Sequence, residues 1–195
     1  MSKVIIHESG MDFGPYATAD CLHLEKSEAY GHCPEGVKMA EFALVRKERI
    51  LFVEAKSSSP RPETQPNFDD FLAEIREKME NALLMLLGMR IGRHRDVALP
   101  RNVDKANLAT IGFMFVLVIN GHKEEWLSDL NDALNNAVRG IAGAFPMKFS
   151  PAIMVLNEGL AAEKKLVIPR ASSRASKLTG KFDTKKATPA KNESE

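Results

Sequence analysis

The chain has 195 residues, of which 44% are hydrophobic and 27% are charged, and its formal net charge is +1. This composition is typical of a globular protein with one substantial core, and it excludes fibrous and collagen-like classes. The longest apolar run, around residues 111–119, is too short to span a bilayer, and no signal-peptide region opens the chain, so we expect a cytoplasmic protein without membrane contact.

The positive charge is concentrated at the C-terminus. From Arg170 onward there are seven basic and three acidic residues, whereas residues 1–169 carry 20 basic and 23 acidic residues. The segment 170–195 has few large apolar side chains, which predicts a disordered basic tail after a single α/β domain at 1–169. A nucleic-acid binder usually has a larger basic surplus than this domain.

Neither cysteine nor histidine spacing indicates a zinc site. Cys21 and Cys33 form no Cys-x-x-Cys motif, which predicts reduced thiols. The histidines lack the helical spacings of metal ligands, so we treat all five as structural or surface residues: His7, His23, His32, His94 and His122.

The first clear elements of the chain form a hairpin. Gly10, Gly14 and Pro15 predict a short strand at 4–6 followed by a loop, and 21–30 is either a short helix or a strand running into a turn. The apolar segments 39–45 and 49–56 then predict two antiparallel strands.

A turn at Lys47-Glu48 sets the register of that hairpin. It pairs Val45 with Ile50 and Ala43 with Phe52. Lys-Glu is a poor two-residue turn compared with Asn-Gly, and a five-residue loop would shift the pairing.

Two helices and further strands follow. Asn67 is expected to cap an amphipathic helix that ends near Gly88 or Gly92, and a second amphipathic helix is expected at 123–140. Strands are expected at 110–119, 152–156 and, at the edge, 165–168. The predicted fold is therefore a central mixed β-sheet whose N-terminal hairpin carries an acidic site, flanked by two long amphipathic helices.

The hairpin brings three charged side chains together. Glu54 and Lys56 lie on one side of their strand, and the predicted register places Glu41 opposite Glu54. Facing carboxylates repel each other unless a cation lies between them, and oxygen ligands beside a lysine suit Mg²⁺ or Mn²⁺. The alternative is a solvated, salt-bridged hairpin face.

A basic cluster follows the first helix. Arg90, Arg93 and Arg95 are candidates for phosphate contact, and the alternative is an exposed loop at the helix end.

The order of these elements resembles the PD-(D/E)xK nuclease-like superfamily, most closely over residues 21–87. Glu41 matches the first acidic residue of the motif, although Ala40-Glu41 replaces the usual Pro-Asp, and Glu54-Ala55-Lys56 matches the (D/E)xK triplet. Family members often supply a further glutamate from an earlier element. By that resemblance, Glu25 is the candidate, with Glu28 next.

The resemblance implies a Mg²⁺- or Mn²⁺-dependent nuclease, a hydrolase of phosphodiester bonds that acts on DNA in restriction, repair or defence. Glu41, Glu54 and Glu25 would bind the metal, and Lys56 would complete the catalytic set. Two alternatives stay open: an inactive nuclease-like interaction protein, and a metal-dependent hydrolase of a small phosphate ester or nucleotide. The sequence also leaves open a homodimer or a protein partner.

Overall fold

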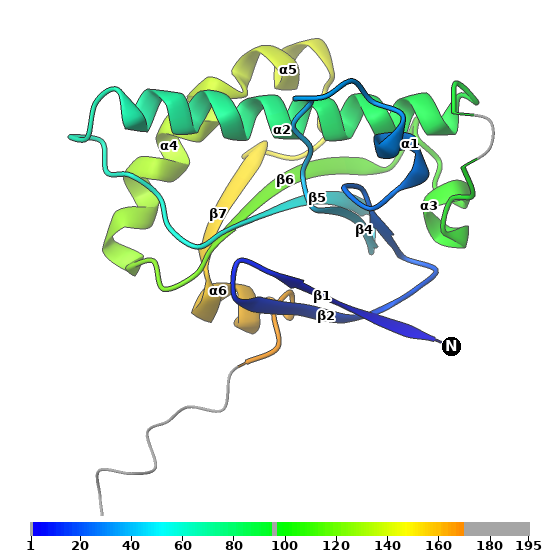
Figure 1. Cartoon of the computed structure of the whole chain (residues 1–195), viewed down its shortest axis with the longest axis horizontal. Coiled ribbons are helices and arrows are strands. Elements are labelled where there is room, and N and C mark those ends of the chain that lie inside the picture. Colours follow the sequence, from blue (N-terminus) through cyan, green and yellow to red (C-terminus); the bar gives the residue numbers. More distant parts are fainter. Residues whose placement is uncertain (1, 95–96, 170–195) are drawn as a thin grey trace, which may run out of the picture.

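The computed structural model describes residues 2–94 and 97–169. The predicted basic tail at 170–195 lies outside the described residues. The chain folds into an α/β structure with a five-stranded mixed sheet, a two-stranded hairpin and several helices (Figure 1). None of the described helices is long and apolar enough to cross a membrane.

The main sheet has the strand order β3-β4-β5-β6-β7. Its strands are β3 (Cys21–His23), β4 (Phe42–Arg46), β5 (Arg49–Lys56), β6 (Gly112–Ile119) and β7 (Ile153–Asn157). β3 pairs antiparallel with β4, and β4 pairs antiparallel with β5, whereas β5, β6 and β7 are mutually parallel. All eight residues of β6 are buried, as expected for a central strand covered on both faces.

The predicted register of the β4–β5 hairpin is confirmed. Val45 pairs with Ile50 and Ala43 with Phe52, so that the turn consists of Lys47 and Glu48. Lys47 adopts a positive φ of 56°, the left-handed conformation that a tight two-residue turn requires. The poor turn sequence is therefore overridden by the pairing of two buried apolar strands.

Helix α2 (Asn67–Arg90) connects β5 to β6 and covers one face of the sheet (Figure 1). Its buried side chains include Phe71, Ile75 and Met79. The predicted cap was wrong: the capping position is Pro66, which makes no side-chain hydrogen bond, and Asn67 is already helical. The helix ends between the two glycines that were expected to terminate it.

The second predicted helix, at 123–140, is three shorter pieces. They are the 3₁₀ turn η1 (Glu124–Trp126), α4 (Leu127–Ala137) and α5 (Arg139–Ala144). The chain bends at Val138, whose φ and ψ of −90° and 3° depart from helical values while its side chain stays fully buried. Burial of Val138 thus competes with straight continuation of α4.

The loop predicted after residue 6 is wrong, because the chain forms a hairpin there. Strands β1 (Lys3–Glu8) and β2 (Met11–Ala17) pair antiparallel around Ser9 and Gly10, whose φ values of 48° and 73° suit a tight hairpin turn. Gly14 has a φ of 119°, and a Cβ there would lie 2.8 Å from the Val4 carbonyl oxygen. Gly10 and Gly14, which suggest a loop in the sequence, thus supply backbone conformations that this hairpin requires.

The remaining elements are short. Segment 21–30 contains both of the elements proposed for it, β3 and then the start of α1 (Glu28–Gly31). Helices α3 (Arg101–Lys105) and α6 (Glu158–Glu163) complete the described part. The predicted edge strand at 165–168 is reduced to a bridge between Phe13 and Val167.

Two apolar layers enclose the sheet. One lies between the sheet and helices α2 and α4, and includes Ile50 and Phe52. The other lies between the sheet and the β1–β2 hairpin, and includes Leu51 and Val53. Because side chains alternate along β5, Glu54 projects into the layer beneath α2.

Candidate functional site

Glu41 and Glu54 lie near each other at the end of the β4–β5 hairpin, close enough for the charge of Glu54 to raise the pKa of Glu41. Phe42, the first residue of β4, pairs with Val53, so continuing the register by one residue places Glu41 opposite Glu54. Glu54 is 0% exposed and Glu41 is 6% exposed, which makes them the two buried acidic residues of the described chain. In each, Oε2 is buried without a hydrogen-bond partner.

Two lysines contact the Glu54 carboxylate. Lys78 Nζ, from α2, lies 2.8 Å from Glu54 Oε1, and Lys56 Nζ lies 3.4 Å from the same oxygen. Lys56 also lies 2.6 Å from Oε1 of Glu74 on α2. The prediction that Glu54 and Lys56 share one side of β5 is therefore confirmed, and α2 adds a second ammonium and a third carboxylate.

Glu25 joins this group through Lys78. Its Oε1 lies 3.5 Å from Lys78 Nζ, and the backbone N–H groups of Leu24 and Glu25 approach the Glu41 carbonyl at 2.9 and 3.5 Å. The structure thus brings together all the predicted acidic and lysine residues, Glu25, Glu41, Glu54 and Lys56. Glu28, the second choice for the early glutamate, is exposed on α1.

Sequence reasoning missed Glu74 and Lys78. They are four residues apart on α2, beside the buried Ile75 and Met79. A charged pair that borders the apolar stripe of a helix faces the edge of the surface that the helix covers. That placement was the available signal.

Burial dominates the electrostatics of the two carboxyl groups. It raises the pKa of Glu41 to about 8, with added repulsion from Glu54, Glu25 and Glu8. Burial also raises the pKa of Glu54, to about 7, although Lys78 and Lys56 oppose the increase. Burial acts to lower the pKa of Lys78, but the Glu54 carboxylate outweighs it, and the net pKa is raised.

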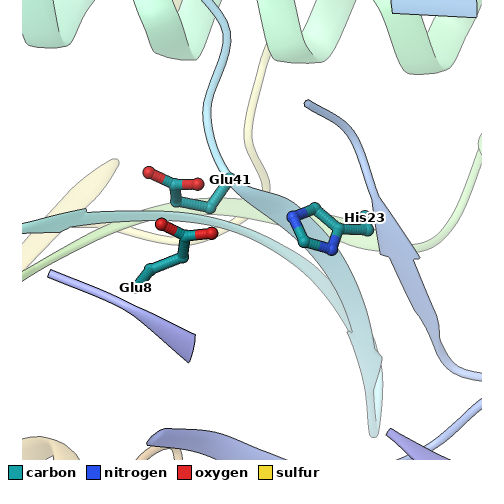
Figure 2. A group of neighbouring side chains, drawn as sticks. All are labelled: Glu8, His23 and Glu41. Carbon is teal, nitrogen blue, oxygen red and sulfur yellow. The ribbon is translucent and has the colours of Figure 1, made fainter. Parts of the chain in front are cut away.

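A second group shares Glu41. Glu8 at the end of β1, His23 in β3 and Glu41 each offer one ligand atom, and these three atoms lie within 4.8 Å of one another (Figure 2). His23 Nε2 is buried without a hydrogen-bond partner, and burial lowers the pKa of its imidazole. His23 was predicted to be a structural or surface residue. Glu8 was not considered, because no sequence pattern indicates that the end of β1 packs near β3.

The predicted metal ligands Glu25, Glu41 and Glu54 differ from the group of Glu8, His23 and Glu41 in that a lysine lies among them. Lys78 lies between the carboxylates of Glu25 and Glu54 and contacts both. Among residues 2–94 and 97–169, the three potential ligand residues with atoms within 4.8 Å of one another are Glu8, His23 and Glu41. Metal binding by Glu25, Glu41 and Glu54 stays a prediction.

Of the predicted phosphate-binding arginines, Arg90 is the last residue of α2 and Arg93 follows shortly after it. Arg90 Nη1 donates to the Val103 and Ala106 carbonyls at 2.8 and 2.9 Å, which ties the end of α2 to the C-terminal half of α3. Arg93 is exposed, and Arg95 lies outside the described residues. Arg90 is about 18 Å along the helix axis from Lys78. Nucleic-acid binding by these arginines stays a prediction.

Two cavities lie near β5, one adjoining the site and one at the other end of the strand. A cavity of about 530 Å³ adjoins Glu74, and its charged lining residues are Lys38, Asp70, Glu74 and Glu77. A cavity of about 630 Å³ lies at the opposite end of β5, and its charged lining residues are Arg46, Lys47, Glu48, Arg49 and Lys164. The acidic cavity adjoins the site through Glu74, whereas the basic one is about 16 Å away along the strand.

Comparison of the chain with protein-family models, with curated proteins and with solved structures found no match. Its function is therefore inferred from the chemistry of the side chains gathered around Glu41 and Glu54.

Proposed function

We propose that the protein is a metal-dependent phosphodiesterase, a nuclease of the PD-(D/E)xK type that acts on DNA with Mg²⁺ or Mn²⁺. The observation that carries this proposal is the opposed, buried pair Glu41 and Glu54, in which both Oε2 atoms lack a hydrogen-bond partner. The order of hairpin, Glu-x-Lys triplet, long helix and buried parallel strand also supports it.

The residues fit a divalent cation. A buried acceptor without a partner costs free energy, and two facing carboxylates add repulsion. A divalent cation would satisfy the free oxygens and replace the repulsion with coordination. Glu41 and Glu54 would hold it, with Glu8, His23 or Glu25 as further donors from neighbouring elements.

The contacts of Lys56 support a role for it beside the reacting groups. The bound metal would supply Lewis-acid activation of the phosphate and a more acidic water. Lys56 Nζ is held between Glu54 and Glu74, at 3.4 and 2.6 Å, so the ammonium has a fixed position beside the metal ligands. It would orient the attacking water and stabilise negative charge on the phosphate.

A second candidate function is a non-catalytic interaction protein. It is favoured by the pairing of Glu54 with both Lys56 and Lys78, which already supplies positive charge to that carboxylate. In this alternative the lysines replace the metal, and the cluster stabilises the fold. The unpartnered oxygen of Glu41 favours the metal site, because neither lysine is paired with it among the described residues.

The test compares wild type with Glu41→Gln, Glu54→Gln and Lys56→Met. Each protein is incubated with plasmid, linear duplex and single-stranded DNA, RNA and a small phosphodiester, in Mg²⁺, Mn²⁺ or chelator. Glu77→Gln is the matched control, because Glu77 also lies on α2 but pairs with Lys38 at 3.1 Å and has no ion pair with the proposed metal ligands or lysines of the site among the described residues.

We expect cleavage by wild type and Glu77→Gln that chelator abolishes, and a loss of at least about a hundredfold in the other three variants. Cleavage that persists in Glu54→Gln and Lys56→Met would remove these residues from catalysis. Absence of cleavage on every substrate would reject the nuclease and favour the interaction protein. Cleavage of the small phosphodiester alone would reassign the substrate class.

A further inference from the structure

We propose that Glu8, His23 and Glu41 form a mixed nitrogen and oxygen site for a divalent transition metal. The β1–β2 hairpin contributes Glu8 to this site. The site shares Glu41 with the proposed phosphodiesterase and in that respect rests on the proposed function. It differs in using two residues outside the Glu41, Glu54 and Lys56 set, and in the class of metal that it selects.

The geometry is close to that of a bound ion. The three ligand atoms lie within 4.8 Å of one another (Figure 2). An ion with bonds of about 2.1 Å keeps its ligand atoms roughly 3 to 4.2 Å apart. Side-chain shifts of less than about an ångström would therefore bring all three atoms into coordination distance.

Buried, unpartnered atoms distinguish this group from an ordinary acidic cluster. Glu41 is 6% exposed, and its Oε2 has no hydrogen-bond partner. His23 Nε2 is also buried without one. Glu8 makes a 3.7 Å ion pair with the exposed Lys26, a contact that solvent weakens. Metal binding would satisfy both orphaned atoms and disrupt at most this weak pair.

The hairpin holds Glu8 in place. Glu8 precedes the Ser9-Gly10 turn, and Asn120 Nδ2, just beyond β6, donates to the Ser9 carbonyl at 3.0 Å. Ile6 and Phe13 of the hairpin are buried against the sheet. The ligand from β1 is therefore fixed relative to β3 and β4, which supply the other two.

The imidazole determines the class of metal. Mg²⁺ strongly prefers oxygen ligands and dehydrates reluctantly, whereas imidazole nitrogen suits Fe²⁺ and Zn²⁺, and Mn²⁺ accepts it alongside carboxylates more readily than Mg²⁺ does. Two carboxylates and one imidazole leave further positions on the ion for water. We therefore expect the protein to bind Mn²⁺ more tightly than Mg²⁺.

The test is Mn²⁺ binding to the full chain, measured by calorimetry and by electron paramagnetic resonance. The variants are Glu8→Gln, His23→Gln and Glu54→Gln, and the control is His7→Gln, because His7 is exposed in the same strand as Glu8 and pairs with Asp12. Thermal unfolding of each variant confirms that it is folded.

We expect Glu8→Gln and His23→Gln each to weaken Mn²⁺ binding at least about tenfold, with His7→Gln unchanged and Mg²⁺ binding weaker than Mn²⁺ binding in wild type. Bound Mn²⁺ should show a nitrogen hyperfine coupling that His23→Gln removes. Unchanged binding in Glu8→Gln and His23→Gln, or equal affinity for the two ions, would overturn the inference.

The outcomes separate this inference from the proposed function. Loss of Mn²⁺ binding in Glu54→Gln but not in Glu8→Gln or His23→Gln would place the metal at the carboxylate pair, which rejects the mixed site and leaves the nuclease. Binding that depends on Glu8 and His23 in a protein that cleaves nothing would reject the nuclease and support the mixed site.

Discussion

Lys78 Nζ lies 2.8 Å from Oε1 of Glu54, although the two residues are 24 positions apart and belong to different elements. Glu54 is fully buried, so this ammonium arrives from α2 to compensate a carboxylate that solvent does not reach. Helix α2 is therefore held on the sheet by an ion pair as well as by apolar contacts.

Removing the ammonium should therefore be more damaging than removing both charges. We predict that Lys78→Met lowers the free energy of unfolding by about 3 kcal/mol, because the buried Glu54 carboxylate loses its nearer ammonium and, among the described residues, keeps only Lys56 at 3.4 Å. Glu54→Gln in the same protein should recover most of that loss. Urea unfolding of the four proteins in a double-mutant cycle measures the coupling. Additive effects would show that the pair contributes nothing to stability.

The metal-free protein should lose stability as the pH rises. The pKa of Glu41 is raised from 4.5 to about 8, so between these values the folded state binds more protons than the unfolded state. Glu54, whose pKa is raised to about 7, acts in the same direction. The contribution of these two carboxyl groups to the free energy of unfolding should therefore be complete below about pH 4.5 and be lost as the pH rises towards 8, the reverse of an ordinary carboxylate. Thermal melts in chelator across this range measure the slope.

Glu41→Gln is the control for that slope. The lowered pKa of His23 acts in the opposite direction below pH 6.5, and it stays in both proteins. We expect a shallower decline in the variant, and stabilisation of wild type by Mn²⁺ that is larger at pH 8 than at pH 5. Parallel curves for the two proteins would contradict the assignment of the slope to Glu41.

Local patterns were sufficient to predict the central half of the site. Alternation of apolar residues in two short segments fixed the register, and the register placed Glu41 opposite Glu54. The same alternation placed Lys56 beside Glu54. These relations depend only on residues within one hairpin, where a shift of one position would expose the apolar side chains.

The rest of the site depends on contacts between distant segments. Lys78 reaches Glu54 because α2 crosses the sheet at one angle, and helical periodicity does not specify that angle. Glu8 reaches His23 and Glu41 only after the β1–β2 hairpin has packed on the sheet. That hairpin was not predicted, because it contains Gly10 and Gly14, and glycine is also frequent in loops. The break after α4 at Val138, whose side chain is fully buried, likewise depends on packing in the core.

The basic rim of the larger cavity offers an alternative surface for phosphate. Lys47 and Lys164 line it and make no ion pair among the residues that the structure describes. We predict that Lys47→Gln with Lys164→Gln weakens DNA binding and reduces its salt slope by about 1 to 2, because each phosphate contact releases about one counterion. Titrations at several salt concentrations measure both quantities.

Arg93→Gln tests the segment that follows α2 in the same titrations. A reduced slope in Arg93→Gln alone would assign phosphate contact to the end of α2. Equal slopes in every variant would exclude both surfaces, and deletion of residues 170–195 would then show whether the basic tail binds DNA.

Asn120 should act as a positioning residue for the metal site. Its side-chain amide donates to the Ser9 carbonyl at 3.0 Å, one residue after Glu8. Asn120→Ala should let the hairpin turn move and weaken Mn²⁺ binding by about tenfold, the usual scale for residues that orient metal ligands. Asn81→Ala is the matched control, because Asn81 donates to the Lys38 carbonyl at 2.9 Å on the other side of the sheet. Equal Mn²⁺ affinities for the two variants would show that Glu8 needs no such anchor, whereas a loss confined to Asn120→Ala would link the hairpin to the metal through one hydrogen bond.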